Sequence, residues 1–239
     1  MNLMLEKIRR ISHWLLPRVC VGCGFDSYEL TLDLCVDCKV NLPWLPSGCY
    51  QCGLQLHKPS ESIICNKCQD SPPPFNRLCA LFSYKPPLTK LIASFKFGRQ
   101  LYPGALFSKL LAEAVTEDWY ANKSLPQVII PVPLHMSRQR QRGYNQAAEI
   151  SRQLAAELNI ELDIDACLRV KNTKAQARLN KNKRTRNLEA AFIANTKPSY
   201  KHVALIDDVV TTGSTIRAVS KALVSAGVEQ IDVWCVCRA

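Results

Sequence analysis

The feature that most constrains this chain is the stretch VALIDDVVTTGST at residues 203–215. Its apolar run is typical of a strand buried on both faces of a parallel sheet. The pattern that follows predicts a helix capped by Ser214 or Thr215 and ended near Gly227. A strand followed by a small-residue loop and a helix N-terminus forms an anion-binding site, because the backbone N–H groups and the positive end of the helix dipole both point toward the bound anion. We therefore expect this loop to bind a phosphate group.

An acidic pair, Asp207 and Asp208, precedes the loop. Carboxylates there suit sugar hydroxyls or a divalent metal ion that accompanies phosphates. A buried strand with an Asx-type turn is one alternative. Walker B and helicase acidic pairs also follow apolar runs, but those lack the continuation TTGST. The stretch resembles the phosphoribosyl pyrophosphate (PRPP) signature of the type I phosphoribosyltransferases. The resemblance implies that the acidic pair holds the ribose hydroxyls, that Mg²⁺ accompanies PRPP and that the loop wraps the 5-phosphate. The loop residues are Thr211, Thr212, Gly213, Ser214 and Thr215.

Alternating strand and helix patterns fill the chain after residue 75. Apolar runs predict strands at residues 78–84, 127–134 and 231–237. Apolar spacing of three and four predicts helices at 88–98, 102–119 and 144–158. Such alternation predicts an α/β fold with a parallel sheet.

Four C-x-x-C pairs lie between residues 20 and 68. In a cytoplasmic protein this pattern favours metal over disulfides, and a redox relay is the weaker alternative. Eight thiolates make two four-cysteine zinc sites, which are structural because no coordination position is open to water. The repeated spacing favours pairing the first pair with the second and the third with the fourth, while a cross-braced arrangement stays open. The expected ligands are Cys20, Cys23, Cys35, Cys38, Cys49, Cys52, Cys65 and Cys68.

The N-terminal segment does not resemble a secretory signal. Charged residues such as Glu6 and Arg9 interrupt the apolar region that export requires, and no apolar run is long enough to span a bilayer. We expect a cytoplasmic protein, with docking at the inner membrane surface as the alternative role of an amphipathic helix before Pro17. The prolines at 72–74 predict a boundary between an N-terminal zinc module, residues 1–70, and a second domain, residues 75–239.

Basic residues make the formal net charge +11, which favours nucleic acid or polyphosphorylated small molecules as partners. One basic segment, residues 135–146, follows an expected strand and carries three arginines at two-residue spacing. Another, residues 169–187, has no acidic residue and could close over pyrophosphate or follow a nucleic-acid backbone. A solvated surface loop is the alternative for each segment.

Several short motifs follow one another along the chain: the cysteine pairs, PPPF, IASFKFG, PVPLH with RQRGYNQ, TKAQARLNKNKRTRNL, the PRPP signature and VWCVCR. Together they resemble the ComF (ComFC/GntX-like) family over essentially the whole chain. The resemblance implies a parallel twisted sheet of the type I phosphoribosyltransferase kind behind a zinc-ribbon module. It also implies a role in competence and natural transformation, handling imported single-stranded DNA with competence proteins at the inner face of the membrane. By the same resemblance, the pyrophosphate neighbours are Pro133, Leu134, Arg142, Gly143, Asn145 and Gln146, and the covering loop contributes Lys183 and Arg184.

Enzymatic turnover is a separate question from PRPP binding. No stretch is recognised as the hood with which phosphoribosyltransferases select a nucleobase or amine acceptor. The alternatives to a DNA-handling role are therefore an active Mg²⁺-dependent phosphoribosyltransferase in nucleotide salvage or metabolism, and a PRPP-sensing regulator.

Overall fold

A computed structural model of the chain describes residues 18–27, 33–46, 48–56, 63–171, 190–195, 197 and 200–239. Contacts within the chain divide it into two units, Met1–Leu42 and Pro43–Ala239. The second unit therefore holds Cys49, Cys52, Cys65 and Cys68 together with the sheet. The boundary expected at the prolines of residues 72–74 stays a prediction.

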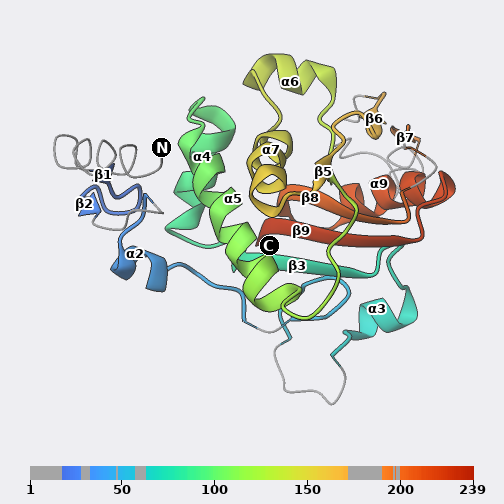
Figure 1. Ribbon diagram of the computed structural model, residues 1–239, viewed down its shortest axis with the longest axis horizontal. Helices are drawn as coiled ribbons and strands as arrows, with labels where there is room; N and C mark the ends of the chain where they lie inside the picture. The colour runs from blue at the N-terminus through green and yellow to red at the C-terminus, as the bar shows by residue number, and fades with distance from the viewer. Residues whose placement is uncertain are drawn as a thin grey trace, which may run out of the picture. The chain divides into compact units, whose positions relative to one another are not determined.

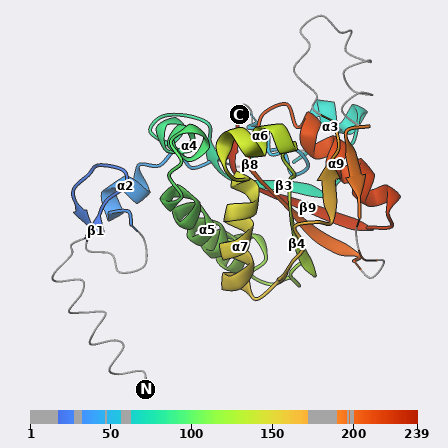
Figure 2. The ribbon, with the colours of Figure 1, turned by 90° about the horizontal axis from the view of Figure 1, so that it is seen from above.

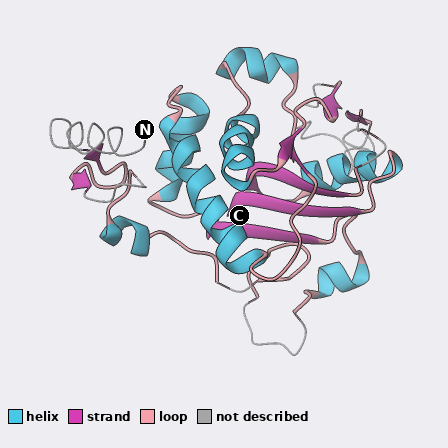
Figure 3. Cartoon of the chain, in the orientation of Figure 1, coloured by secondary structure: helices cyan, strands magenta, loops and turns pink. Residues whose placement is uncertain are grey.

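Five strands form a parallel sheet in the larger unit, in the order β3-β9-β8-β4-β5. Figure 3 draws the strands in magenta. The strands are β3 (Arg77–Ser83), β4 (Val128–Pro131), β5 (Glu161–Leu162), β8 (His202–Val210) and β9 (Gln230–Arg238). Strand β8 is central, and Ala204 pairs with Ile129 on one side and Asp232 on the other. The parallel α/β fold and the strands expected before and after the acidic pair are thereby confirmed.

Helices cover both faces of this sheet, as Figures 1 and 2 show. Helices α5 (Tyr102–Ala114) and α7 (Gln146–Leu158) lie on one face, and α9 (Ser214–Ser225) lies on the other. Helix α4 (Leu88–Phe97) packs on α5, where the rings of Phe95 and Phe107 lie 6.2 Å apart. Burial of both strand faces accounts for the continuous apolar runs in β8 and β9. The three helices predicted between residues 88 and 158 are confirmed.

Helix α6 (Met136–Arg142) was not predicted by apolar periodicity, because its seven residues carry three arginines and one apolar side chain. Its ends are defined instead by hydrogen bonds and backbone geometry. The ring Nδ1 of His135 accepts from the backbone N–H of Ser137 at 3.1 Å, and Gly143 ends the helix with φ of 90°. At the far end of α9, Gly227 has φ of 96° one residue after the cap, as the sequence predicts.

Smaller elements complete the described chain. Strands β6 (Cys167–Arg169) and β7 (Phe192–Ala194) pair antiparallel beside α9. A π-helical turn, η1 (Val115–Trp119), continues α5, and α3 (Asn66–Asp70) belongs to the larger unit. The smaller unit contains β1 (Arg18–Val19), β2 (Asp26–Ser27) and α2 (Val36–Val40). Among the described residues, no helix has the length and apolar character needed to cross a bilayer.

A buried polar cluster joins three of the strands near their first residues. Asp232 Oδ2 lies 3.2 Å from Arg77 Nε and 3.2 Å from His202 Nε2, and it also accepts a hydrogen bond from Tyr120. The Arg77 guanidinium stands 4.3 Å from the centroid of the Tyr120 ring. Burial acts to raise the pKa of Asp232, but the bonds from His202 and Tyr120 and the charge of Arg77 outweigh it, so the pKa is lowered.

Asp232→Asn is expected to lower the free energy of unfolding by about 3 kcal/mol, because it leaves the buried Arg77 without its carboxylate. Urea unfolding at neutral pH measures this change. The control is Glu229→Gln, which breaks the exposed pair with Lys201 and should cost less than about 1 kcal/mol. Equal losses in both variants would contradict the role given to the cluster.

The same cluster predicts an acid dependence. Because the folded-state pKa of Asp232 is lowered, its contribution is present above the ordinary carboxyl pKa and is lost as the pH falls through the folded-state value. Asp232→Asn should therefore be less sensitive to acid over that range than the unsubstituted protein.

Candidate functional site

The C-terminal end of β8 leads directly into a tight loop before α9. Gly213 has φ of 73°, a left-handed conformation that favours glycine, and it is the N-cap residue. The expectation that Ser214 or Thr215 caps the helix is wrong. Ser214 is the first helical residue, and its backbone N–H donates to Thr212 Oγ1 at 3.3 Å. Because a glycine cap supplies no side-chain acceptor, N–H groups of the first turn are left for a ligand or water.

A pocket of about 50 Å³ is formed by this loop, and we call it the loop pocket. The structure brings together here the predicted phosphate residues and one member of the acidic pair. Its lining residues are Asp207, Val209, Val210, Thr211, Thr212, Gly213, Ser214, Thr215 and Ile216. An aspartate, residues with hydroxyl side chains and the start of α9 therefore line one small space.

The acidic pair is held partly buried by three contacts. The backbone N–H of Asp208 donates to Asp207 Oδ1 at 2.9 Å, and that of Val209 donates to Asp208 Oδ1 at 2.7 Å. Asp208 Oδ2 lies 2.9 Å from Nζ of Lys96, whose side chain is 20% exposed. Burial and the charge of Asp208 raise the pKa of Asp207 well above its usual range, and the charge of Lys96 acts in the opposite direction. The carboxylate oxygens are hard ligands of the kind that Mg²⁺ binds.

A second cavity, of about 240 Å³, lies between the end of α4 and helix α6. We call it the cationic pocket, and it is lined by Lys96, Phe97, Arg99, Arg138, Gln141 and Arg142. Phe97 is 73% exposed, and the Arg142 guanidinium lies 5.3 Å from the centroid of its ring. Because Lys96 also pairs with Asp208, the cationic pocket and the acidic pair share one side chain.

Two other predicted pyrophosphate neighbours, Asn145 and Gln146, form hydrogen bonds next to this pocket. Asn145 caps α7, accepting from Ala147 at 3.1 Å, and its Nδ2 donates to the Val132 carbonyl at 3.0 Å. Gln146 is buried, and its Oε1 accepts from Arg142 Nη1 at 3.0 Å. The contact with Gln146 orients Arg142.

The remaining predicted ligand residues do not line either pocket among the described residues. Pro133 is buried and Leu134 is half-buried in the connection from β4 to α6, and Gly143 ends that helix. Their roles toward a ligand stay predictions. Lys183 and Arg184 lie outside the described residues.

Sequence reasoning did not single out Lys96 and Arg99. Both lie at the end of α4, more than a hundred residues before Asp208 in the sequence. The local signal is that Lys96 and Arg99 lie on either side of Phe97 at the end of α4.

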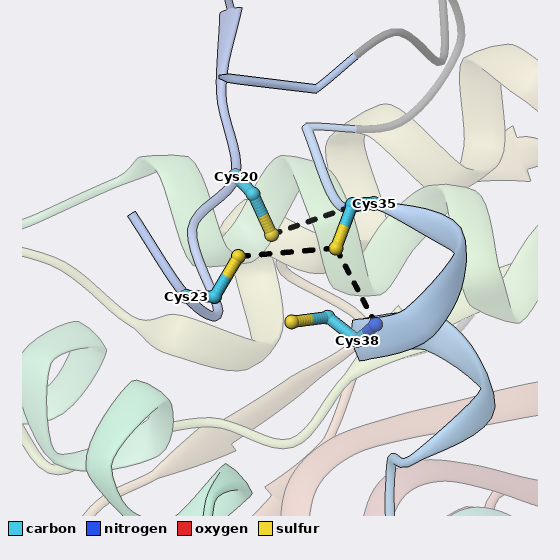
Figure 4. A group of neighbouring side chains, drawn as sticks. All are labelled: Cys20, Cys23, Cys35 and Cys38. Carbon is cyan, nitrogen blue, oxygen red and sulfur yellow. Dashed lines mark hydrogen bonds between the residues drawn. The ribbon is translucent and has the colours of Figure 1, made fainter. Parts of the chain in front are cut away.

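The eight cysteines gather into two groups in the sequential order favoured by their spacing. The first cysteine group is Cys20, Cys23, Cys35 and Cys38, and the second is Cys49, Cys52, Cys65 and Cys68. Figure 4 shows the first group with all four side chains directed toward a common space. Within each group the sulfur atoms all lie within 4.8 Å of one another.

The donor atoms fit a tetrahedral zinc ion. A Zn–S bond of about 2.3 Å places sulfurs about 3.8 Å apart, and the Sγ atoms of Cys23 and Cys35, like those of Cys52 and Cys65, are separated by 3.8 Å. Burial acts to raise the pKa of Cys20, but backbone N–H groups, above all that of Cys35, lower it to about 6. Such N–H groups similarly lower the pKa of Cys49 to about 7. Both groups therefore fit structural zinc sites.

Comparison with known proteins identifies the family. Competence protein F of Haemophilus influenzae is 36% identical over 224 residues, which cover 92% of this chain and 96% of the relative. This chain belongs to the ComF family. DNA utilization protein YhgH of Escherichia coli, another ComF relative, is 36% identical over 80% of this chain and 83% of its own length. Competence protein ComFC of Streptococcus pneumoniae is 28% identical over 66% of this chain and 67% of its own length.

The ComF chain also matches the phosphoribosyl transferase domain model over residues 126–239. Among solved structures, the glutamine PRPP amidotransferase of Bacillus subtilis complexed with ADP and GMP is 13% identical, with a TM-score of 0.40 over 60% of this chain and 30% of that one. The matched domain contains β4, β8, α9 and β9. The match to the domain model, together with the parallel sheet, confirms the type I phosphoribosyltransferase fold expected for this ComF chain.

Lys96→Met is expected to raise the pKa of Asp207 further, because it removes the cation that opposes repulsion between the two carboxylates. Isotope-labelled carboxyl groups of aspartate, followed by NMR during a pH titration, measure the change. Lys90→Met, on an exposed position of the same helix, is the matched control and should leave the titration unchanged. A pKa that stays constant or falls in Lys96→Met would contradict the pairing.

Proposed function

We propose that this ComF-family protein binds PRPP together with Mg²⁺ at the C-terminal end of β8. The observation that carries the proposal is that Asp207 lines the same small pocket as the loop before α9, so a carboxyl group and the predicted phosphate-binding loop lie side by side. Carboxylates accept hydrogen bonds from a ribose diol, whereas hydroxyls and helix N-terminal N–H groups donate to a phosphate. A phosphorylated ribose uses both.

The cationic pocket supports the remaining part of the ligand. Pyrophosphate carries several negative charges, and Lys96, Arg99, Arg138 and Arg142 concentrate positive charge beside the acidic pair. Guanidinium groups match phosphate oxygens with paired hydrogen bonds. When bound, Mg²⁺ supplies further neutralisation of the pyrophosphate. The chain itself positions the ribose through Asp207 and Asp208.

A role in handling single-stranded DNA is the second part of the proposal. Relatives of this chain are named for competence and for DNA utilization, and the net charge of +11 favours a polyanion. One specific observation supports single strands: Phe97 is exposed at a pocket lined with cations. Exposed aromatic rings stack on unpaired bases, while neighbouring cations bind the phosphates.

The alternative is turnover of PRPP by an active phosphoribosyltransferase, in which an acceptor attacks the anomeric carbon and pyrophosphate leaves. A PRPP-sensing regulator is the third candidate. Assays with PRPP, Mg²⁺ and a set of nucleobases and amines separate these, because only a transferase releases pyrophosphate. We place the function in the cytoplasm, with competence proteins at the inner membrane surface as the partners.

Calorimetry with PRPP and Mg²⁺ tests the site. The variant Asp207→Asn/Asp208→Asn should bind roughly ten- to a hundredfold more weakly, because it can no longer form charge-assisted hydrogen bonds to the ribose or coordinate the metal as strongly. Asp118→Asn, at an exposed position after α5, is the matched control and should bind as the unsubstituted protein does. If the unsubstituted protein gives no binding heat with PRPP and Mg²⁺ and no competition by pyrophosphate, the proposed ligand is wrong.

Phe97→Ala is expected to weaken binding of a fluorescent single-stranded oligonucleotide by about 1–3 kcal/mol, the usual contribution of one stacked base. Its salt dependence should stay the same, because no charge is removed. Arg99→Gln/Arg138→Gln should instead lower the slope of log affinity against log salt by roughly 0.7 for each phosphate that the protein no longer neutralises. Leu101→Ala, also exposed but uncharged and not aromatic, serves as the control. Unchanged affinity in Phe97→Ala would rule out the stacking interaction.

A further inference from the structure

The second cysteine group is attached to the loop pocket by a buried arginine. Arg238, the last residue of β9, is 9% exposed, and its Nε donates to the Cys52 carbonyl at 2.8 Å. Its Nη1 donates to the Val210 carbonyl at 3.1 Å and also to the carbonyl of Thr211. One planar guanidinium therefore joins the turn that carries two cysteine ligands to the residues with which the phosphate loop begins.

The Cys52 carbonyl is fixed by the geometry of its own turn. The backbone N–H of Gly53 donates to the Cys49 carbonyl at 2.8 Å, and that of Cys49 donates to the Leu54 carbonyl at 2.8 Å. A metal ion bound by Cys49 and Cys52 holds the two ends of this turn together. Loss of the metal removes that constraint from the carbonyl to which Arg238 is bonded.

Other contacts hold the same turn against the sheet. Gly53 has φ of 66°, and a Cβ placed on it would stand 2.6 Å from a methyl carbon of Leu78 in β3. The Tyr50 carbonyl accepts from the N–H of Leu78 at 3.4 Å. Arg217, in the first turns of α9, donates to the carbonyls of Ser71 and Pro72, both at 3.3 Å. The turn between Cys49 and Cys52 thus contacts β3, and the segment that follows α3 contacts α9.

We propose that metal occupancy of the second cysteine group sets the shape of the phosphate loop through Arg238, and so controls its affinity for phosphorylated ligands. Arg238 is a positioning residue in this scheme. It holds the carbonyls of Val210 and Thr211, and because the N–H of a planar trans peptide points opposite to its carbonyl, it fixes the direction of the N–H groups of Thr211 and Thr212. The inference about ligand affinity rests on the proposed PRPP site.

The test compares Arg238→Met, which removes every donor, with Arg238→Lys, which keeps the charge but not the planar fork. Metal content is measured by atomic absorption, PRPP affinity by calorimetry, and exposure of the loop amides at residues 211–216 by hydrogen exchange. Arg238→Met should keep both zinc ions, bind PRPP about tenfold or more weakly and exchange the loop amides faster. Arg238→Lys should recover part of the affinity. Arg152→Gln, an exposed arginine on α7, is the matched control.

Removal of the metal is tested separately in each cysteine group. Cys49→Ser/Cys52→Ser should lose one zinc ion and exchange the loop amides faster. Adding Arg238→Met to this variant should increase the exchange rate only slightly, because both changes break the same connection. Cys20→Ser/Cys23→Ser, in the unit Met1–Leu42, is the comparison for losing an equal amount of zinc. An equal effect on the loop from the first group would overturn the inference, and so would normal loop exchange in Arg238→Met.

The two proposals fail in different ways. If PRPP does not bind at all, the proposed ligand is wrong, while hydrogen exchange still decides whether the second cysteine group controls the loop. If PRPP binds and the Arg238 and Cys49/Cys52 variants neither weaken it nor speed exchange, the coupling is wrong and the ligand stands.

Discussion

Mutual repulsion between two adjacent carboxylates is the constraint on which the rest of the site depends. Asp207 and Asp208 follow the buried part of β8, where a low dielectric disfavours two negative charges. The backbone N–H groups that follow each aspartate and the ammonium of Lys96 offset that cost. Lys96 is the penultimate residue of α4, and α4 packs on α5. The packing of α4 therefore brings to the acidic pair a cation that offsets part of the repulsion.

The features predicted from the sequence are those encoded in consecutive residues. The acidic pair, the loop around Gly213 and the cysteine pairs each lie within a short window, and three helices show apolar periodicity. Helix α6 was missed because polar residues with terminal caps, not an apolar face, define it. The contribution of Lys96 depends on a contact between segments far apart in the sequence, which no local pattern encodes. The N-cap at Gly213 was missed because Ser214 and Thr215, which have side chains typical of N-caps, lie inside the first turn of the helix.

The two cysteine groups show how similar local sequences acquire different surroundings. Their ligand spacing is nearly identical, and each places its third cysteine just before a short helix, α2 or α3. Spacing was sufficient to predict which cysteines gather, because tetrahedral coordination is a short-range requirement. The second group lies in the unit that contains the sheet and the first does not, and the cysteine spacing does not predict this difference. That outcome depends on partners outside the group, chiefly Leu78 and Arg238.

The sharing of Lys96 has consequences for how ligands affect one another. In the structure its charge is directed at Asp208, although its side chain also lines the cationic pocket. A divalent cation bound by the acidic pair would repel the ammonium and compete for the same carboxylate, leaving more of the Lys96 charge for the cationic pocket. Binding at either place must then alter affinity at the other by the same factor, since linkage between two ligands is reciprocal. The charge available in the cationic pocket and the occupancy of the acidic pair are for this reason energetically coupled through one side chain.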